Sequence, residues 1–252
     1  MITIDSAELY RIMLILIRAA GLMALIPIFS GATLPVMMRV ALSGFLALFV
    51  WQVAGDLGPV PPTVVGLVRA GVHEMLVGLL MGLASRLLFY GLEMAGQVIS
   101  SEIGLSLANT VDPVTHQQTT PFNTLLFYFG ANMFLLTGAD HACIVAFARS
   151  FEVFPPTAAF DAAIADRVVS QTGRIFNTML QVSAPIVAVN FLVNLALAAL
   201  GRSAPSLEVF SSSFAIRIFA GLIVFGLSLT LTAQHVLSEL QSMPETMLRF
   251  LR

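Results

Sequence analysis

The sequence contains no lysine, a single cysteine and few charged residues of either sign. Charged residues make up 10% of the chain, whereas soluble domains carry roughly a quarter. So few charges cannot cover a soluble surface of this size, and the apolar side chains are expected to face lipid or other protein. The net charge of −2 argues against nucleic-acid binding, which needs a basic patch. Because Cys143 is the only cysteine, no internal disulfide can form.

All basic residues other than histidine are arginines. A guanidinium makes two parallel hydrogen bonds to a carboxylate and is weakly hydrated, so this bias fits an interior in which cations are paired. A bias in codon usage explains the same observation equally well. Arg18 interrupts the first hydrophobic run of the chain, which argues against a secretory signal peptide there.

Catalytic motifs are absent from the sequence. His73 and Glu74 are not followed by a second histidine one turn later, so the zinc-protease pattern fails. No Gly-x-Ser-x-Gly elbow and no phosphate-binding loop occurs. Asp140 and His141 could form a proton relay, but an isolated pair of this kind is more often structural. We therefore expect no enzyme, no catalytic residue, no metal site and no cofactor.

Six hydrophobic segments account for most of the chain. Hydrophobic residues make up 58% of it, and the mean hydropathy is +0.92. Several segments reach the roughly 20 residues that a helix needs to cross a bilayer. Turn-forming glycines and prolines separate the segments, with no domain linker between them. The sequence therefore predicts an all-α, multi-helix, membrane-associated protein of one domain, residues 1–252, with helices over residues 9–29, 36–53, 64–100, 122–148, 175–200 and 214–236.

The third segment carries Glu74 and other ionisable residues, which cost about 2.5 kcal/mol or more each at a bilayer centre. On a helix, one stripe collects Arg86, Tyr90, Glu93 and Gln97, and another stripe collects Gly71, Gly78 and Gly82. The glycine row predicts a close approach by another backbone. The polar stripe fits a water-filled path, contact with a neighbouring subunit, or an ion-pair network within the chain.

The fifth and sixth segments also carry rows of polar and small residues. Ser183, Asn190 and Asn194 fall on one face of the fifth, and Gly221, Ser228 and Thr232 fall on one face of the sixth. Buried amides and hydroxyls between membrane helices must find hydrogen-bond partners, either within this chain or on another subunit. Pro185 is expected to kink the fifth segment, because it removes a backbone donor and clashes with the preceding turn.

A polar loop, residues 106–123, lies between two strongly apolar segments. It has no positive charge but is dense in side chains that form hydrogen bonds. Irregular backbone near membrane depth is tolerated only where it is buried in protein or lines an aqueous cavity. The loop is therefore either a pore plug or an ordinary exposed connection. The candidate plug residues are Asn109, Asp112, Pro113, His116, Gln117, Gln118, Pro121 and Phe122.

Short motifs in a fixed order run along nearly the whole chain. They include Gly78-Leu-Leu-Met-Gly-Leu-Ala-Ser-Arg86, Gly96-Gln97, Gly104-Leu-Ser-Leu-Ala, Asp112-Pro113, Gln117-Gln118, Gly138-Ala-Asp-His141 and Gly201-Arg-Ser-Ala-Pro205. No single motif is specific, but the ordered set resembles the FliR/SctT family of type III secretion export-gate subunits. The sequence departs from the family pattern at Glu208, Ser211 to Ser213 and Ile216.

The resemblance implies a structural subunit of a type III protein export channel, and we expect the flagellar one. One copy would join several FliP-like and FliQ-like subunits, and would itself resemble a FliP-like half fused to a FliQ-like half with bent helical hairpins. FlhB-like and FlhA-like components and unfolded export substrates are the further partners implied. The location implied is the bacterial inner membrane, within the flagellar basal body. The family also implies that the polar loop helps to close the resting channel.

The resemblance also gives roles to the remaining polar positions. Subunit packing is implied for Gly71, Gly78, Gly82, Arg86, Glu93, Gln97, Asn190 and Asn194, and the last inter-helix loop contains Arg202, Pro205, Glu208 and Phe210. Helices sheltered by partner subunits would make a count of hydrophobic segments overstate the true membrane spans. The alternatives are the injectisome subunit SctT and a stand-alone secondary transporter, since polar stripes and broken helices also occur in transporters.

Overall fold

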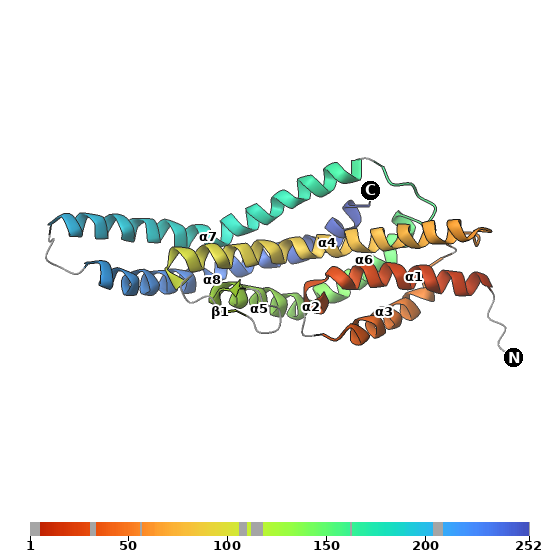
Figure 1. Ribbon diagram of the computed structural model, residues 1–252, viewed down its shortest axis with the longest axis horizontal. Helices are drawn as coiled ribbons and strands as arrows, with labels where there is room; N and C mark the ends of the chain where they lie inside the picture. Colours follow the sequence, from red (N-terminus) through yellow and green to blue (C-terminus); the bar gives the residue numbers. More distant parts are fainter. Residues whose placement is uncertain are drawn as a thin grey trace. The chain divides into compact units, whose positions relative to one another are not determined.

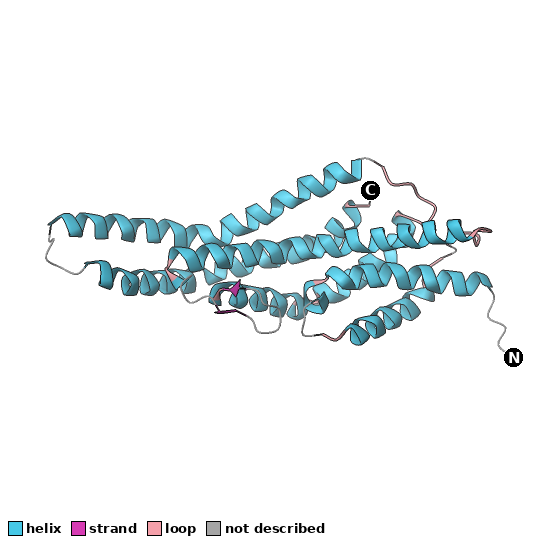
Figure 2. Cartoon of the chain, in the orientation of Figure 1, coloured by secondary structure: helices cyan, strands magenta, loops and turns pink. Residues whose placement is uncertain are grey.

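The chain folds almost entirely into helices (Figures 1 and 2). The computed structural model describes residues 6–30, 34–55, 57–105, 110–111, 118–161, 163–203 and 209–251. Within these residues, the only strands are two short ones, β1 (Thr110–Val111) and β2 (Gln118–Thr119), which pair antiparallel. The prediction of an all-α protein is confirmed. The helices are α1 (Ser6–Leu25), α2 (Pro27–Ser30), α3 (Val36–Trp51), α4 (Val64–Glu102), α5 (Pro121–Leu136), α6 (Ala139–Val153), α7 (Ala163–Ser203) and α8 (Val209–Arg249).

The helix boundaries differ from the hydrophobic segments in three places. The fourth segment divides into α5 and α6, which are bent by 69° at a break near Gly138. Helix α7 begins at Ala163, inside the polar stretch that precedes the fifth segment, and it continues through Pro185 without ending. Helix α8 continues through Pro244 to Arg249, well beyond the predicted end at residue 236. The extra turns are too polar for a hydropathy pattern to detect.

Three of the described helices are long and apolar enough to cross a membrane. They are α4, α7 and the part of α8 from Ser213 to Arg249, and the bent pair of α5 and α6 makes a fourth if it counts as one span. The chain is therefore an all-α membrane protein with three or four candidate spans, fewer than its six hydrophobic segments.

The chain comprises two compact units, and each is built from separate stretches of sequence. The first consists of Met1–Leu87, Phe134–Thr172 and Leu240–Arg252, and the second of Leu88–Met133 and Gly173–Glu239. Helices α4, α7 and α8 each contribute residues to both units. The prediction of a single domain therefore stays a prediction.

In the first unit, α4 lies unusually close to α1. A side chain at Gly78 would overlap the backbone carbonyl of Arg18, and a Cβ at Gly82 would lie 2.8 Å from the carbonyl oxygen of Leu22. The approach is reciprocal, because a Cβ at Gly21 would lie 2.7 Å from the carbonyl oxygen of Met75. Gly71 lies on the same side, where its Cβ would be 3.4 Å from Ile17 Cδ1. The glycine row thus meets α1 of the same chain.

In the second unit, α4 packs against α5 and α7 through further glycines. A Cβ at Gly91 would lie 2.6 Å from Thr178 Cβ on α7, and a Cβ at Gly130 would lie 2.6 Å from Leu92 Cδ1. Large apolar side chains on α7 and α8 remain exposed, and among the most exposed are Phe191, Leu192, Phe219, Ile223, Leu227 and Leu231. Apolar area of this extent requires lipid or another protein against it.

Candidate functional site

Within the polar loop, the structure describes residues 110–111 and 118–123. Residues 106–109 and 112–117 lie outside the described part of the chain, and with them Asn109, Asp112, Pro113, His116 and Gln117. The backbone of Gln118 belongs to β2, where it pairs with Val111, and Thr119 pairs with Thr110. Strands β1 and β2 therefore bring together the two sides of residues 112–117. Pro121 and Phe122 begin α5.

The C-terminal end of the loop is fastened to α4 and α8 within the second unit. The Phe122 side chain is 4% exposed, and its ring lies edge-on to that of Phe225 on α8, with the centroids 5.0 Å apart. A Cβ at Gly96 would lie 2.5 Å from the backbone nitrogen of Asn123, so only glycine allows this contact. Asn123 Nδ2 also donates to the carbonyl oxygen of Glu93 at 3.4 Å. These contacts fix the start of α5 on the C-terminal third of α4.

The residues that precede the loop, 102–104, pack against α7 and α8 in the same unit. Glu102 is the last residue of α4, and its backbone oxygen and carboxylate both accept hydrogen bonds from Asn190 Nδ2, at 2.7 and 2.8 Å. The Ile103 side chain fills the space left by the missing side chain of Gly221. Gly104 has a φ of 84°, a conformation that favours glycine, and it lies beneath the Phe214 ring. Packed, specific contacts are thus made by residues 102–104, which precede the loop, and by Phe122 and Asn123 at its C-terminal end.

The polar stripe of α4 changes in exposure along its length. Arg86 and Glu93 are half-buried, whereas Tyr90 and Gln97 are exposed.

On α7, Asn190 is 3% exposed and Asn194 is half-buried, but only the Asn190 amide bonds to Glu102. In the last inter-helix loop, Arg202 is exposed, Pro205 and Glu208 lie outside the described residues, and Phe210 is described by its backbone alone.

Sequence reasoning missed a buried ion-pair cluster in the first unit. The Arg18 guanidinium on α1 donates two hydrogen bonds to the Glu74 carboxylate on α4, at 2.5 and 2.9 Å, and both side chains are fully buried. It also donates to Ser150 Oγ at 2.9 Å and to the carbonyl oxygen of Phe154 at 3.0 Å. Its carbon Cζ lies 3.9 Å above the Phe151 ring. The cluster therefore joins α1, α4 and the end of α6.

A signal for this cluster was present in the sequence. Arg18 and Glu74 are opposite charges placed inside two apolar segments, and ionisable residues in such segments pair with one another. His73 extends the cluster, with Nδ1 3.3 Å from a Glu74 carboxylate oxygen and its ring stacked on that of Phe154 at 5.4 Å between centroids. Arg18, Glu74 and His73 thus connect α1, α4 and the C-terminal end of α6.

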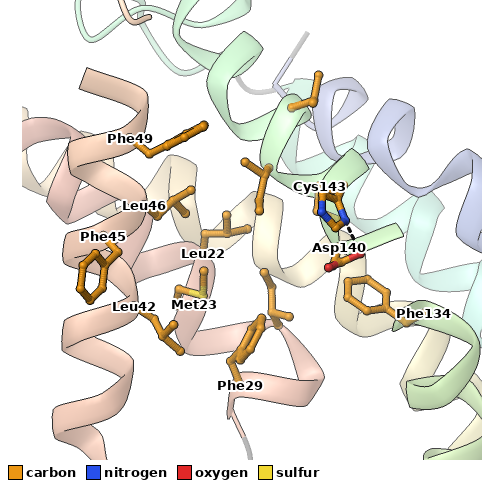
Figure 3. A pocket seen from close by; sticks show the side chains of 14 residues that line it. Leu22, Met23, Phe29, Leu42, Phe45, Leu46, Phe49, Phe134, Asp140 and Cys143 are labelled. Atoms are coloured by element: carbon orange, nitrogen blue, oxygen red, sulfur yellow. Dashed lines mark hydrogen bonds and ion pairs between the residues drawn. The ribbon is translucent and has the colours of Figure 1, made fainter. Parts of the chain in front are cut away.

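An apolar groove lies beside the α5–α6 bend in the first unit (Figure 3). Its volume is about 580 Å³, and α1, α2, α3 and α6 supply most of its walls. The polar side chains on its lining are Asp140 and His141, whose Oδ1 and Nδ1 atoms are 3.0 Å apart. The His141 side chain is 83% exposed, so the pair lies at the surface. No group of three or more histidine, cysteine or acidic residues that could hold a metal ion occurs within the described ranges.

Comparison with known proteins places these features in a family. Residues 9–243 match the family described as bacterial export proteins, family 1. The flagellar biosynthetic protein FliR of Caulobacter vibrioides is 29% identical over 228 residues, which cover 88% of this chain and 90% of the relative. FliR of Bacillus subtilis is 28% identical over 84% of this chain and 83% of the relative. Yop proteins translocation protein T of Yersinia pestis is 28% identical over 78% of this chain and 77% of the relative. The chain belongs to the bacterial export proteins of family 1, the FliR/SctT family.

Proposed function

We propose that this chain is a structural subunit of the export gate of a type III protein export apparatus. In this assembly one copy joins several FliP-like and FliQ-like subunits in the bacterial inner membrane, and unfolded polypeptides pass through the channel that they form. The family membership supports a role in the export apparatus. The exposed apolar faces of α7 and α8 supply the area that such partners would cover. The subunit performs no catalysis, and energy for export comes from other components.

The mechanism is supported by the contacts on either side of the polar loop. Asn190 and Gly221 contact Glu102 and Ile103 just before the loop, and Phe225 and Gly96 contact Phe122 and Asn123 at its C-terminal end. The centre of such a loop can block a channel while its ends stay fixed on the subunit. Its side chains are neutral or acidic, so the hydrogen bonds that seal the lumen can re-form with water when the gate opens. The loop therefore closes the resting gate.

Shortening the loop tests this mechanism. Deletion of residues 112–117 should make the resting channel leak, which potassium efflux from cells that carry the whole assembly would measure. A matched control replaces the same six residues by glycine and serine, which keeps the length but removes the sealing side chains. The control should leak less than the deletion and more than the wild type. Unchanged ion permeability in the deletion strain would contradict the role of the loop.

The stoichiometry can be measured directly. Native mass spectrometry of the chain, co-expressed with its neighbouring genes and purified in detergent, should show one copy with several copies of two smaller helical proteins. A homo-oligomer without partners would overturn the export-gate proposal and favour a secondary transporter. The same preparation would show whether FlhB-like and FlhA-like components bind.

We assign the chain to the flagellar apparatus and not to an injectisome. Percentage identity does not separate the two, since FliR of Bacillus subtilis and the Yersinia pestis protein are both 28% identical to it. The alignment extends over more of this chain for FliR of Caulobacter vibrioides, 88%, than for the Yersinia protein, 78%. Deletion of the gene should abolish flagellar assembly and motility. Loss of effector secretion with intact flagella would contradict this assignment.

A further inference from the structure

Another pocket lies in the first unit, where α1 and the start of α4 meet the segments 57–61 and 156–159. Its volume is about 330 Å³, which is within the range of small-ligand sites in proteins. Pro59, Pro61 and Pro156 stiffen the two segments, because a proline ring fixes the backbone φ. These walls therefore have less backbone freedom to lose when a ligand binds.

The titratable side chains on the pocket wall are Tyr10, Arg69 and His73, and none of the described residues that line it is acidic. Arg69 is exposed, and its guanidinium makes no ion pair or hydrogen bond to the described part of the chain. Tyr10 is 7% exposed, and its hydroxyl also lacks a hydrogen-bond partner within the described ranges. A hydroxyl and a guanidinium with hydrogens left to donate suit an anion. Phosphate is well matched, since a guanidinium can bind two of its oxygens at once.

His73 adds an acceptor to these two donors. Its Nδ1 lies 3.3 Å from a Glu74 carboxylate oxygen, and because an ionised carboxylate only accepts hydrogen bonds, Nδ1 carries the hydrogen. Nε2 of the neutral ring is then an acceptor, and it is buried without a donor in the described part of the chain. Leaving a buried acceptor unpaired destabilises a protein. A ligand hydroxyl in the pocket would donate to it.

Arg69 lies at the boundary between the pocket and an exposed apolar face of α4. At about 100° per residue, one side of Arg69 carries the residues of α4 that line the pocket, Gly66, Ala70 and His73. The other side carries three valines that are more than half exposed, Val65, Val68 and Val72. Helix α4 is also long and apolar enough to cross a membrane. A molecule with its polar end in the pocket could therefore lay an apolar tail along the valines.

We propose that this pocket binds the phosphate of an anionic phospholipid whose headgroup also carries a hydroxyl, as in phosphatidylglycerol. Arg69 and Tyr10 donate to the phosphate oxygens, and the headgroup hydroxyl donates to His73 Nε2. The acyl chains cover the valine face of α4. Inorganic phosphate could bind the same donors, but it has no apolar part to cover that face. Basic pockets beside membrane helices are a common kind of site for anionic headgroups.

Lipid titration followed by native mass spectrometry tests this site. The full chain, with any subunits that purify with it, is delipidated in detergent and titrated with phosphatidylglycerol, phosphatidylcholine or inorganic phosphate. The wild type should bind one phosphatidylglycerol more tightly than either of the others, because phosphatidylcholine brings a positive charge towards Arg69. Arg69→Gln should weaken phosphatidylglycerol binding about tenfold, as expected for loss of a charge-assisted hydrogen bond. Tyr10→Phe keeps the ring but removes the donor, and it should weaken binding as well.

Arg249→Gln is the matched control for charge. It removes the same charge from an exposed arginine of the first unit that does not line this pocket, so it should leave binding unchanged. Equal binding of phosphatidylglycerol and phosphatidylcholine, or equal losses in Arg69→Gln and Arg249→Gln, would overturn the site. Inorganic phosphate that binds as tightly as phosphatidylglycerol would overturn the lipid as its occupant. So would a subunit that excludes phosphatidylglycerol from the wild type and dissociates from Arg69→Gln.

A lipid that lacks only the headgroup hydroxyls tests the part played by His73. Phosphatidylethanol has the same charge as phosphatidylglycerol but no hydroxyl, so it should bind the wild type about fivefold more weakly. His73→Phe keeps an aromatic ring against Phe154 but removes Nε2, and it should bind the two lipids equally. A preference for phosphatidylglycerol that persists in His73→Phe would contradict the hydrogen bond to His73.

The lipid site does not rest on the proposed function, and the two can fail separately. Phosphatidylglycerol binding that is weakened by Arg69→Gln but not by Arg249→Gln supports the site even if deletion of residues 112–117 causes no potassium efflux. Efflux from the deletion strain supports the loop as the closure of the channel even if all lipids bind equally.

Discussion

At the scale of the residue, Arg18 shows how the chain pairs a fully buried charge. The Arg18 guanidinium makes four hydrogen bonds, two of them to Glu74, and also lies over the Phe151 ring. A lysine could not do the same, because an ammonium lacks the planar fork that bonds a carboxylate twice. The absence of lysine therefore fits the environment of Arg18, the arginine that is fully buried among the described residues.

Removing one member of this pair should destabilise the protein strongly. Arg18→Met or Glu74→Met leaves the other charge buried and unpaired, which costs about 3–5 kcal/mol. The double variant removes both charges and should be destabilised less than either single variant. Thermal unfolding in detergent, followed by circular dichroism, would measure all three. Additive losses in the double variant would show that the two charges do not depend on each other.

At this scale, the sequence predicted which residues share one face of a helix, but not which residues on other helices they contact. The spacing of Gly78 and Gly82 predicted a close approach, and the structure supplies α1 as the neighbour. The spacing of Asn190 and Asn194 predicted one polar face of α7, yet only Asn190 bonds to Glu102. Periodicity depends on one helix alone, whereas a hydrogen-bond partner depends on how separate helices pack. Pairings such as Arg18 with Glu74 therefore required the structure.

At the scale of the element, hydropathy located the helices but not their ends. Residues 163–174 lie outside the predicted fifth segment, 175–200, although they form the first turns of α7. Polar residues form helices readily when tertiary contacts support them, and hydropathy does not measure that tendency. The break between α5 and α6 was missed for the opposite reason, because apolar residues continue on both sides of Gly138.

The α5–α6 bend should depend on the backbone conformation of Gly138. This residue has a φ of 70°, and no atom lies within 4 Å of the position of a Cβ. Gly138→Ala should therefore lower the free energy of unfolding by about 1–2 kcal/mol, because alanine disfavours the left-handed backbone conformation. Gly138→Asn should lower it less, because asparagine tolerates that conformation. Thermal unfolding of the two variants would compare them. Equal stability of both variants with the wild type would show that the bend does not need glycine.

At the scale of the whole molecule, the chain leaves much of its apolar surface without cover. Within the chain, 61% of the apolar stretch of α4 is buried, but only 22% of that of α7 and 11% of that of α8. A helix that is apolar all round and largely exposed has to face lipid or another protein. The hydrophobic segments thus predicted the membrane association correctly. They could not separate lipid-facing from subunit-facing residues, because both surfaces are equally apolar.

The two compact units should nevertheless unfold together. Helices α4, α7 and α8 each run through both units, so melting one unit breaks helices of the other. Trp51, the only tryptophan, reports on the first unit, where its indole nitrogen donates to a Glu8 carboxylate oxygen at 2.8 Å. Circular dichroism reports on all the helices. In a thermal scan of the detergent-solubilised chain, the two signals should therefore give the same midpoint, as a single cooperative transition requires. A fluorescence change that clearly precedes the loss of helix would mean that the first unit unfolds by itself, and the chain would then have two domains.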